Sequence, residues 1–134
     1  MLASCQCGAL TATIADDAAP MTVLCHCLDC QRRSGSPFGV IAYFTAAAVV
    51  IAGEAREFTR AADMGNSFTS GFCPTCGSTL YCVAGKYPGI IGITLGTIAD
   101  PAFPAPLRSV YEQSRHHWVA LPDGTACHPQ GRDS

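Results

Sequence analysis

Apolar and polar residues alternate in short runs along most of the chain, a pattern typical of β-strands. In the run at 9–14, for example, Leu10, Ala12 and Ile14 fall on one face of the expected strand. Proline and glycine recur between the runs, and no long helical period is present. The pattern predicts strands at 9–14, 21–24, 39–44, 49–52, 56–60, 66–71, 78–83, 90–95, 108–111 and 118–121.

One helix of a turn or two is expected at 28–34. Together these elements predict a mainly β fold of several small antiparallel sheets. The chain has 134 residues, which is the length of one domain. We expect a single domain at 1–123 and a flexible C-terminal tail at 124–134, since that last stretch is polar and contains glycine.

The composition excludes two broad classes of protein. Hydrophobic residues make up 49% of the chain and charged residues only 13%, whereas a typical soluble domain has about 25% charged residues. Disorder is therefore excluded as the main description. The formal net charge is −2 and no basic run is present, so we expect no nucleic-acid partner.

Membrane insertion and export are not expected either. The longest uncharged stretch, 34–53, contains Ser36, Pro37 and Gly39, and its apolar part is shorter than the ~20 residues that span a bilayer. The start at 2–5 is similar to a lipoprotein cleavage box, but only one residue precedes it. These features favour a cytoplasmic protein with no membrane partner.

Nine cysteines dominate the candidate chemistry. An odd number without an export signal argues against a disulfide framework. Seven of the nine fall in tight clusters, at the spacing that lets thiolates converge on one metal ion. The clusters are C-x-C at Cys5 and Cys7, C-x-C-x-x-C at Cys25, Cys27 and Cys30, and C-x-x-C at Cys73 and Cys76.

Two of these clusters predict one closed zinc site. Cys7 is followed by Gly8 and Cys76 by Gly77, and a glycine there lets the chain turn so that backbone N–H groups reach the sulfurs. The pairs Cys5/Cys7 and Cys73/Cys76 are therefore expected to form the two halves of a four-cysteine structural site.

The middle cluster has only three cysteines. Three protein ligands leave one position on zinc for water or a substrate thiol, and zinc lowers the pKa of either. The ligand count thus favours a catalytic site at Cys25, Cys27 and Cys30. The alternatives are closure by a fourth ligand, for which His26, Cys82 and Cys127 are candidates, or a reduced cluster without metal.

Four motifs follow one another along the chain. They are C-x-C-G from Cys5, CHCLDCQRRSGSPFG from Cys25, FCPTCGSTLY from Phe72 and GTIADPAFPAPLRSVYEQSRHHWVALPDG from Gly96. In this order, and over nearly the whole chain, they resemble the glutathione-dependent formaldehyde-activating enzyme family, also known from centromere protein V. The resemblance implies a zinc-pinned fold of coiled β-sheets, sometimes called a β-tent.

The family resemblance also implies an activity and site residues. It places a structural zinc at Cys5, Cys7, Cys73 and Cys76, and a zinc associated with activity at Cys25, Cys27 and Cys30. The founding activity joins glutathione and formaldehyde into S-hydroxymethylglutathione and is classed as a carbon–sulfur lyase. The implied partner is a small-molecule thiol or thiol adduct, with glutathione as the example.

Residues near the cysteine clusters are weaker candidates for a functional role. Arg32 and Arg33 follow the triplet and are candidates to bind a substrate carboxylate, although two solvated surface arginines explain them as well. His26 is expected to point away from the metal. A strand would place His116 and His117 on opposite faces. Core positions are expected for the aromatic residues Tyr43, Phe44, Phe72, Tyr81 and Trp118 and for Cys82, and an exposed thiol for Cys127.

Three classes of function are compatible with the sequence. The favoured one is a zinc-dependent enzyme of the carbon–sulfur lyase type that acts on a thiol adduct of a small electrophile such as formaldehyde. The alternatives are a zinc-stabilised binding module without catalysis and a thiol redox sensor. A homodimer is compatible with the low charge and high apolar fraction.

Overall fold

A computed structural model describes residues 1–134. The chain forms two compact units, each built from two chain segments. The first unit contains Met1–Pro20 and Ala42–Asp100, and the second contains Met21–Ile41 and Pro101–Ser134. No helix is both long and apolar enough to cross a membrane. The fold is mainly β, as the alternating pattern predicts.

A three-stranded antiparallel sheet opens the first unit. It has the order β1 (Leu2–Ser4), β2 (Thr11–Ile14) and β5 (Val49–Ala52). The predicted one-sided burial is confirmed, since Leu10, Ala12 and Ile14 are at most 1% exposed. A 3₁₀ turn at Ala46–Ala48 leads into β5.

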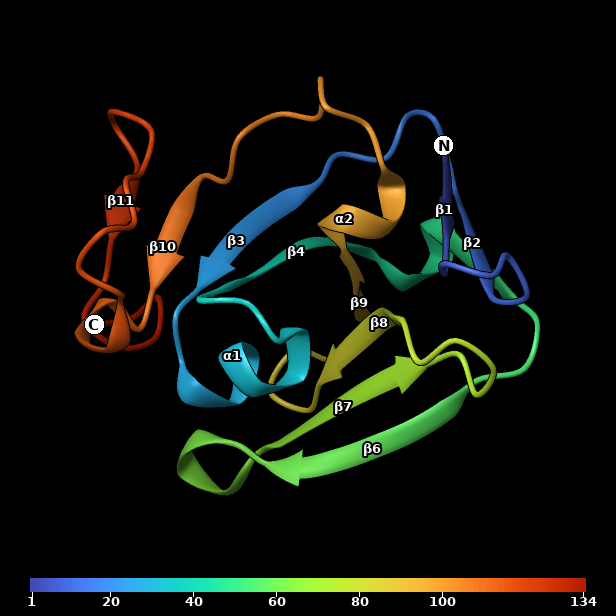
Figure 1. Ribbon diagram of the computed structural model, residues 1–134, viewed down its shortest axis with the longest axis horizontal. Helices are drawn as coiled ribbons and strands as arrows, with labels where there is room; N and C mark the ends of the chain where they lie inside the picture. Colours follow the sequence, from blue (N-terminus) through green and yellow to red (C-terminus); the bar gives the residue numbers. More distant parts are fainter. The chain divides into compact units, whose positions relative to one another are not determined.

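Four further strands of the first unit form an antiparallel ladder in chain order (Figure 1). A short helix, α2, follows the last strand and contacts β1. The turn at Cys73–Ser78 connects the second and third strands, so this ladder presents two of the clustered cysteines. The elements are β6 (Arg56–Ala61), β7 (Ser67–Phe72), β8 (Thr79–Ala84), β9 (Ile90–Thr94) and α2 (Leu95–Ile98), with a 3₁₀ turn at Asp63–Gly65.

The second unit is built around parallel pairing. Strand β10 (Arg108–Val110) pairs in parallel with both β3 (Met21–Cys25) and β11 (Ala126–Cys127). The prediction of antiparallel sheets therefore holds for the ladders of the first unit and not for this one. Helix α1 spans Leu28–Ser34, as predicted, and a 3₁₀ turn at Glu112–Ser114 follows β10.

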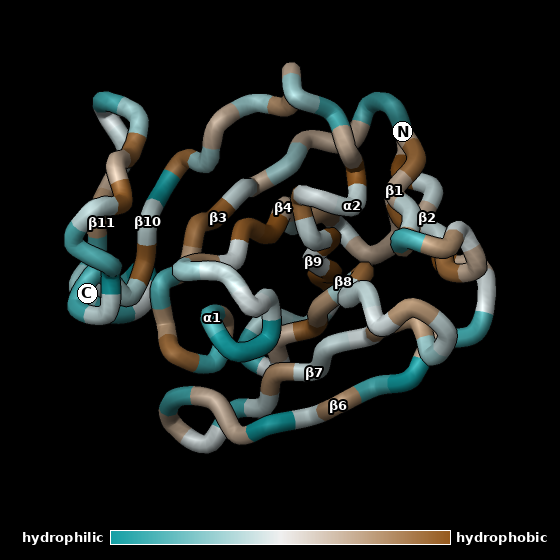
Figure 2. Tube along the Cα trace, viewed as in Figure 1, coloured by the Kyte–Doolittle hydropathy of each residue, from teal (hydrophilic) through white to brown (hydrophobic).

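The chain passes between the units along β4 (Gly39–Thr45), which begins in the second unit and ends in the first. Apolar residues concentrate on β3, β4, β8 and β9, whereas β6 is largely hydrophilic (Figure 2). Among the predicted core residues, Phe44 and Cys82 are fully buried, at 2% and 0% exposure. The strand at 49–52 has the predicted boundaries, and the other confirmed strands differ from the predicted ones by one or two residues at one or both ends.

One predicted strand is wrong. The segment 118–121 forms turns and irregular backbone, and Trp118 is 63% exposed rather than part of the core. His116 and His117 therefore do not alternate across a strand, and both are exposed. The short apolar run at 118–121 has the pattern of a strand, but it does not pair with any neighbouring strand.

Candidate metal centres

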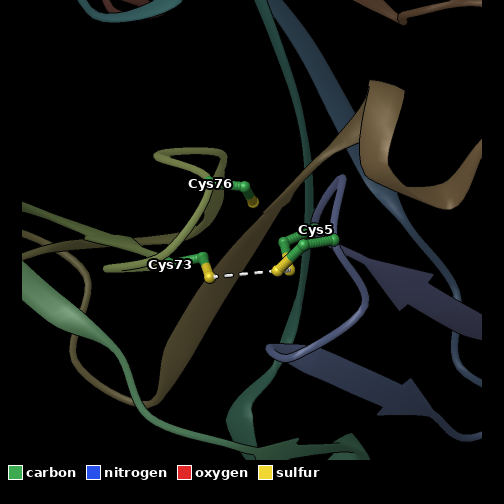
Figure 3. Close-up of side chains that lie close together, drawn as sticks. Cys5, Cys73 and Cys76 are labelled. Carbon is green, nitrogen blue, oxygen red and sulfur yellow. Dashed lines mark hydrogen bonds between the residues drawn. The ribbon is translucent and has the colours of Figure 1, made fainter.

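The first metal-binding candidate is a group of four cysteines in the first unit. Cys5 and Cys7 lie in the loop between β1 and β2, and Cys73 and Cys76 lie in the loop between β7 and β8. All four sulfurs lie within 4.8 Å of one another. Figure 3 shows the side chains of Cys5, Cys73 and Cys76 reaching toward the same space from these two loops. The pairing predicted from the glycines is thus present in the structure.

The two loops have nearly the same backbone hydrogen bonds. The N–H of Cys5 donates to the carbonyl of Leu10 at 2.9 Å, and that of Cys73 donates to Ser78 at 3.0 Å. Gly8 and Gly77 have φ values of 85° and 78°, a left-handed conformation that favours glycine. Each loop therefore turns tightly enough to present both of its sulfurs on one side.

The geometry of these sulfurs fits zinc. Cys7 Sγ lies 3.7 Å from Cys5 Sγ and 3.7 Å from Cys73 Sγ. A tetrahedron with zinc–sulfur bonds of 2.3 Å has edges of about 3.8 Å. The backbone N–H of Leu10 also points at Cys5 Sγ, at 3.2 Å, which favours the thiolate form that a metal requires.

Ser78 adds a local electrostatic contribution to this cluster. Its hydroxyl lies 3.4 Å from Cys76 Sγ. Hydrogen bonds from the hydroxyl and the backbone N–H of Ser78 lower the pKa of Cys76 to about 5. These hydrogen bonds favour the thiolate form of Cys76, the form that binds a metal.

The second candidate is the three-cysteine cluster in the second unit. Cys25 ends β3, Cys27 is the N-cap residue of α1, and Cys30 lies in the first turns of the helix. Their sulfurs lie within 4.8 Å of one another, and no histidine or carboxylate belongs to the group. Cys27 Sγ accepts a hydrogen bond from the backbone N–H of Cys30 at 3.3 Å, so the helix start itself holds two of the sulfurs together.

Crowding of the three thiols opposes their ionisation. Hydrogen bonding with Cys27 and Cys30, together with burial, raises the pKa of Cys25 strongly. For Cys30, a hydrogen bond with Cys25 lowers the pKa, but Cys27 and burial outweigh it and raise the value to about 11. Several thiolates in one small volume repel one another, and a bound cation removes that cost. The donor set therefore suits a divalent metal that prefers sulfur.

In the sequence, His26 lies between Cys25 and Cys27, and its side chain does not join their cluster. The imidazole is fully buried. Its Nε2 lies 2.8 Å from Ser109 Oγ and 3.0 Å from the carboxylate of Glu112, while Nδ1 has no hydrogen-bond partner. Burial lowers the pKa of His26, and the nearby Glu112 only partly offsets this. A neutral ring that donates from Nε2 fits these contacts.

Glu112 is the centre of the network that holds His26. Its carboxylate accepts hydrogen bonds from Ser109 Oγ at 2.8 Å and from Arg115 at 2.9 Å. Burial alone would raise the pKa of Glu112, but these hydrogen bonds outweigh burial and lower it. The carboxylate is therefore ionised at neutral pH and ties the turn after β10 to the cysteine-bearing loop.

Gln31 makes a second connection on the same side of α1. Its Nε2 donates to the carbonyls of His26 and Ser114, at 2.9 and 3.2 Å, and its Oε1 lies 3.0 Å from His116 Nε2. The sequence did not identify Ser109, Glu112, Arg115 or Gln31 as site residues. Gln31 directly follows Cys30 in α1, whereas Ser109, Glu112 and Arg115 are polar residues without special spacing that reach the triplet only through the pairing of β10 with β3.

The other candidates take different positions. Arg32 is exposed, whereas Arg33 is half-buried next to Cys30 and Gly39. Cys82 is buried in β8 and Cys127 is exposed in β11, both as predicted, and neither belongs to a metal-binding group. The candidate metal-binding residues of the structure are thus the seven cysteines of the two clusters.

Comparison with known proteins agrees with this arrangement. The family model described as glutathione-dependent formaldehyde-activating enzyme matches residues 1–114. A crystal structure of a Rhodobacter sphaeroides protein resembles this fold with a TM-score of 0.55 and 18% sequence identity, covering 96% of this chain and 99% of that one. The comparison with curated proteins found no match. At this identity the structural likeness concerns the fold alone.

Proposed function

The chain belongs to the glutathione-dependent formaldehyde-activating enzyme family, and from that premise we propose that it is a zinc-dependent enzyme of the carbon–sulfur lyase type. Its substrate class would be the adduct of a thiol such as glutathione with a small electrophile such as formaldehyde. The observation that carries the proposal is the difference between the two clusters, because one offers four sulfurs and the other only three. A four-sulfur set completes a structural zinc site, and a three-sulfur set suits a catalytic one.

The proposed reaction is a reversible addition. The thiol sulfur forms a bond to the carbonyl carbon, and the proton of the thiol ends on the carbonyl oxygen, giving an S-hydroxymethyl product. Zinc held by Cys25, Cys27 and Cys30 would supply a coordination position at which a thiol loses its proton near neutral pH.

The residues of the chain then have distinct tasks. The three cysteines hold the metal, and the network of His26, Ser109 and Glu112 fixes the loop that carries them. Arg32 and Arg33 are proposed to bind a carboxylate of the substrate. Most of the rate gain would come from holding the thiol and the carbonyl carbon in contact.

We assign the other cluster a structural role. Cys5, Cys7, Cys73 and Cys76 would hold a zinc that links the loop after β1 to the loop after β7. The cytoplasm is the proposed compartment, since clustered cysteines that bind metal must stay reduced.

Replacement of one triplet ligand tests the proposal. Cys27→Ser should lower the rate of S-hydroxymethylglutathione formation by at least about a hundredfold, because even residues that only support metal ligands often cost 10–100-fold. Turnover is followed by NMR of the zinc-loaded protein with glutathione and formaldehyde, and zinc per chain is measured alongside.

Cys127→Ser is the matched control, since Cys127 is exposed and lies outside both clusters. It should keep both turnover and zinc. Full turnover in Cys27→Ser would refute the catalytic assignment. Wild-type protein that holds zinc at both clusters but has no turnover with any thiol would favour a zinc-stabilised binding module.

A further inference from the structure

The C-terminal segment, residues 126–130, runs along the backbone of β10. Strand β11 pairs in parallel with β10, so that Ser109 lies opposite Cys127. The backbone N–H of His128 donates to the carbonyl of Ser109 at 2.9 Å. The match to the family model ends at residue 114, so the C-terminal segment lies in the part of the chain that this match does not cover. Membership of the family therefore assigns no role to it.

Tyr111, directly after β10, has a strained backbone. Its φ of 55° and ψ of 45° lie in the left-handed region, which a bulky residue rarely adopts. Such a conformation persists only where the surrounding structure holds it. Here the N–H of Tyr111 donates to the carbonyl of Gln130 at 2.8 Å, and the N–H of Glu112 donates to the carbonyl of His128 at 3.0 Å. The C-terminal segment thus holds this turn in a conformation that the local sequence disfavours.

The turn directs Glu112 at the loop that carries the three-cysteine cluster. Glu112 begins the 3₁₀ turn after β10, and its carboxylate lies 3.0 Å from His26 Nε2. The backbone N–H of His26 donates to the carbonyl of Val110 at 3.1 Å. In the sequence, His26 stands between Cys25 and Cys27. A short series of contacts therefore connects the C-terminal segment to the clustered cysteines.

We propose that the C-terminal segment positions the three-cysteine cluster and slows the loss of zinc from it. By holding Tyr111 in the left-handed conformation, the segment keeps Glu112 against His26. Groups that orient metal ligands change metal affinity about 10–100-fold when they are lost. The inference rests on the proposed function, of which it needs only the zinc held by the three cysteines. The four-cysteine cluster, which belongs to the other unit, should not respond to the segment.

Zinc release to a chelator measures this role in the full chain. Zinc-loaded wild type is mixed with an excess of the chromogenic chelator pyridylazoresorcinol, and the release that is absent from Cys27→Ser is that of the three-cysteine cluster. His128→Pro removes the N–H that donates to Ser109. Release from the three-cysteine cluster should then be about tenfold faster or more, and release from the four-cysteine cluster should stay within about twofold of wild type.

His128→Ala is the matched control for the loss of the side chain. It keeps the backbone N–H and removes only the imidazole, whose nitrogens lie 3.2 Å from Arg108 Nη1 and 3.0 Å from the Ser134 carbonyl oxygen. Because the proposed contact is made by the backbone, this variant should release zinc from both clusters at the rates of wild type.

A second pair of variants tests the strain at Tyr111. Tyr111→Gly and Tyr111→Ala both remove the ring, but only glycine adopts a positive φ readily. A glycine at this position therefore needs less support from the C-terminal segment. When each change is combined with His128→Pro, Tyr111→Gly should restore most of the zinc retention of the three-cysteine cluster, and Tyr111→Ala should not.

Amide hydrogen exchange provides a readout that leaves the C-terminal segment unaltered. Coupling between two sites is reciprocal, so loss of the zinc should loosen the turn. The N–H groups of Tyr111 and Glu112 should exchange about tenfold faster or more in Cys27→Ser than in zinc-loaded wild type. The N–H of Cys73, which donates to Ser78 in the other unit, should exchange at the same rate in both proteins.

Three results of the release experiment would overturn the inference. They are unchanged release from the three-cysteine cluster in His128→Pro, equally accelerated release from both clusters, or a recovery in Tyr111→Gly no larger than in Tyr111→Ala. If His128→Pro does not fold, hydrogen exchange decides: faster exchange of the Tyr111 and Glu112 N–H groups in Cys27→Ser supports the inference, and unchanged exchange refutes it.

Failure of the proposed function gives a different result. Zinc retention that depends on the C-terminal segment, in a wild type without any turnover, would refute the enzyme and support the positioning role. Turnover by wild type, together with unchanged zinc release in His128→Pro, would support the enzyme and refute the positioning role.

Discussion

His26 stands between two clustered cysteines in the sequence and makes contacts different from theirs. Cys25 and Cys27 face the cluster, while the imidazole between them is buried against Ser109 and Glu112. The contacts join two segments more than 80 residues apart in sequence, since His26 and Ser109 are separated by 83 positions. Residues outside the three-cysteine cluster, Ser109 and Glu112, therefore help to hold the loop that carries Cys25 and Cys27 in place.

Glu112→Gln tests this network at the level of one residue. The variant keeps the size of the side chain but loses the charge that binds Arg115. We expect a loss of about 1–2 kcal/mol in the free energy of unfolding at neutral pH, within the range for hydrogen bonds to charged groups. Urea unfolding provides the measurement. Glu54→Gln, at an exposed position, should stay within about 0.5 kcal/mol of wild type.

The same variant has an expected dependence on pH. The pKa of Glu112 is lowered in the folded state, so its carboxylate adds stability above the pKa of an unfolded glutamate, and that stability is lost as the pH falls through the lowered value. The difference between wild type and Glu112→Gln should therefore shrink toward zero in acid. A difference that is constant from neutral to acid pH would show that the charge of Glu112 contributes nothing.

At the scale of elements, three strands are joined by one side chain. Tyr81 on β8 lies over Gly71 on β7, and its hydroxyl donates to Glu57 on β6 at 2.9 Å. Burial and the Glu57 carboxylate raise the pKa of Tyr81 to about 12. Because β7 and β8 flank the loop with Cys73 and Cys76, this packing also supports the four-cysteine cluster.

Gly71→Ala should disrupt this arrangement. An added Cβ would lie 2.1 Å from the Tyr81 ring, so the ring must leave its place over β7. Overpacking of this kind costs about 1–3 kcal/mol, and urea unfolding should show a loss in that range. Gly96→Ala is the control, since nothing lies within 4 Å of its added Cβ and its φ is not left-handed. Equal stabilities of the two variants would contradict the proposed packing.

Over the whole molecule, the four-cysteine cluster joins two loops of the first unit that are far apart in the sequence. Cys7 and Cys73 are 66 positions apart and their sulfurs lie 3.7 Å apart. A metal that binds only the folded arrangement adds its binding free energy to folding. The cluster is therefore expected to contribute to the stability of the fold rather than to turnover.

Cys7→Ser measures this contribution, because Cys7 is exposed and its replacement leaves the core unchanged. We expect the variant to lose one zinc ion per chain and to unfold at a temperature more than about 10 °C below wild type, given the size of structural zinc binding. Metal analysis and thermal unfolding provide the two readouts. Cys82→Ala removes a cysteine outside both clusters and should keep its zinc. Unchanged zinc content in Cys7→Ser would refute the assignment of this ligand.

Much of the fold follows from local signals. The helix at Leu28–Ser34 and the strand at Val49–Ala52 agree with the sequence pattern in both bounds, and each is followed by a glycine with positive φ, Gly35 or Gly53, that ends it. The predicted strand at 118–121 is wrong, since a short apolar run does not show whether a partner strand exists. Without strand pairing, this segment leaves Trp118 exposed.

The sequence by itself determined the two cysteine clusters, because ligands that share a turn are recognisable from spacing and from glycines such as Gly8 and Gly77. The tertiary structure alone decided which side chains surround them. Parallel pairing of β10 with β3 brings Ser109 and Glu112 to His26, and the start of β4 places Gly39 against Arg33. Contacts between segments far apart in the chain depend on strand pairing and packing, and no local spacing of residues encodes them.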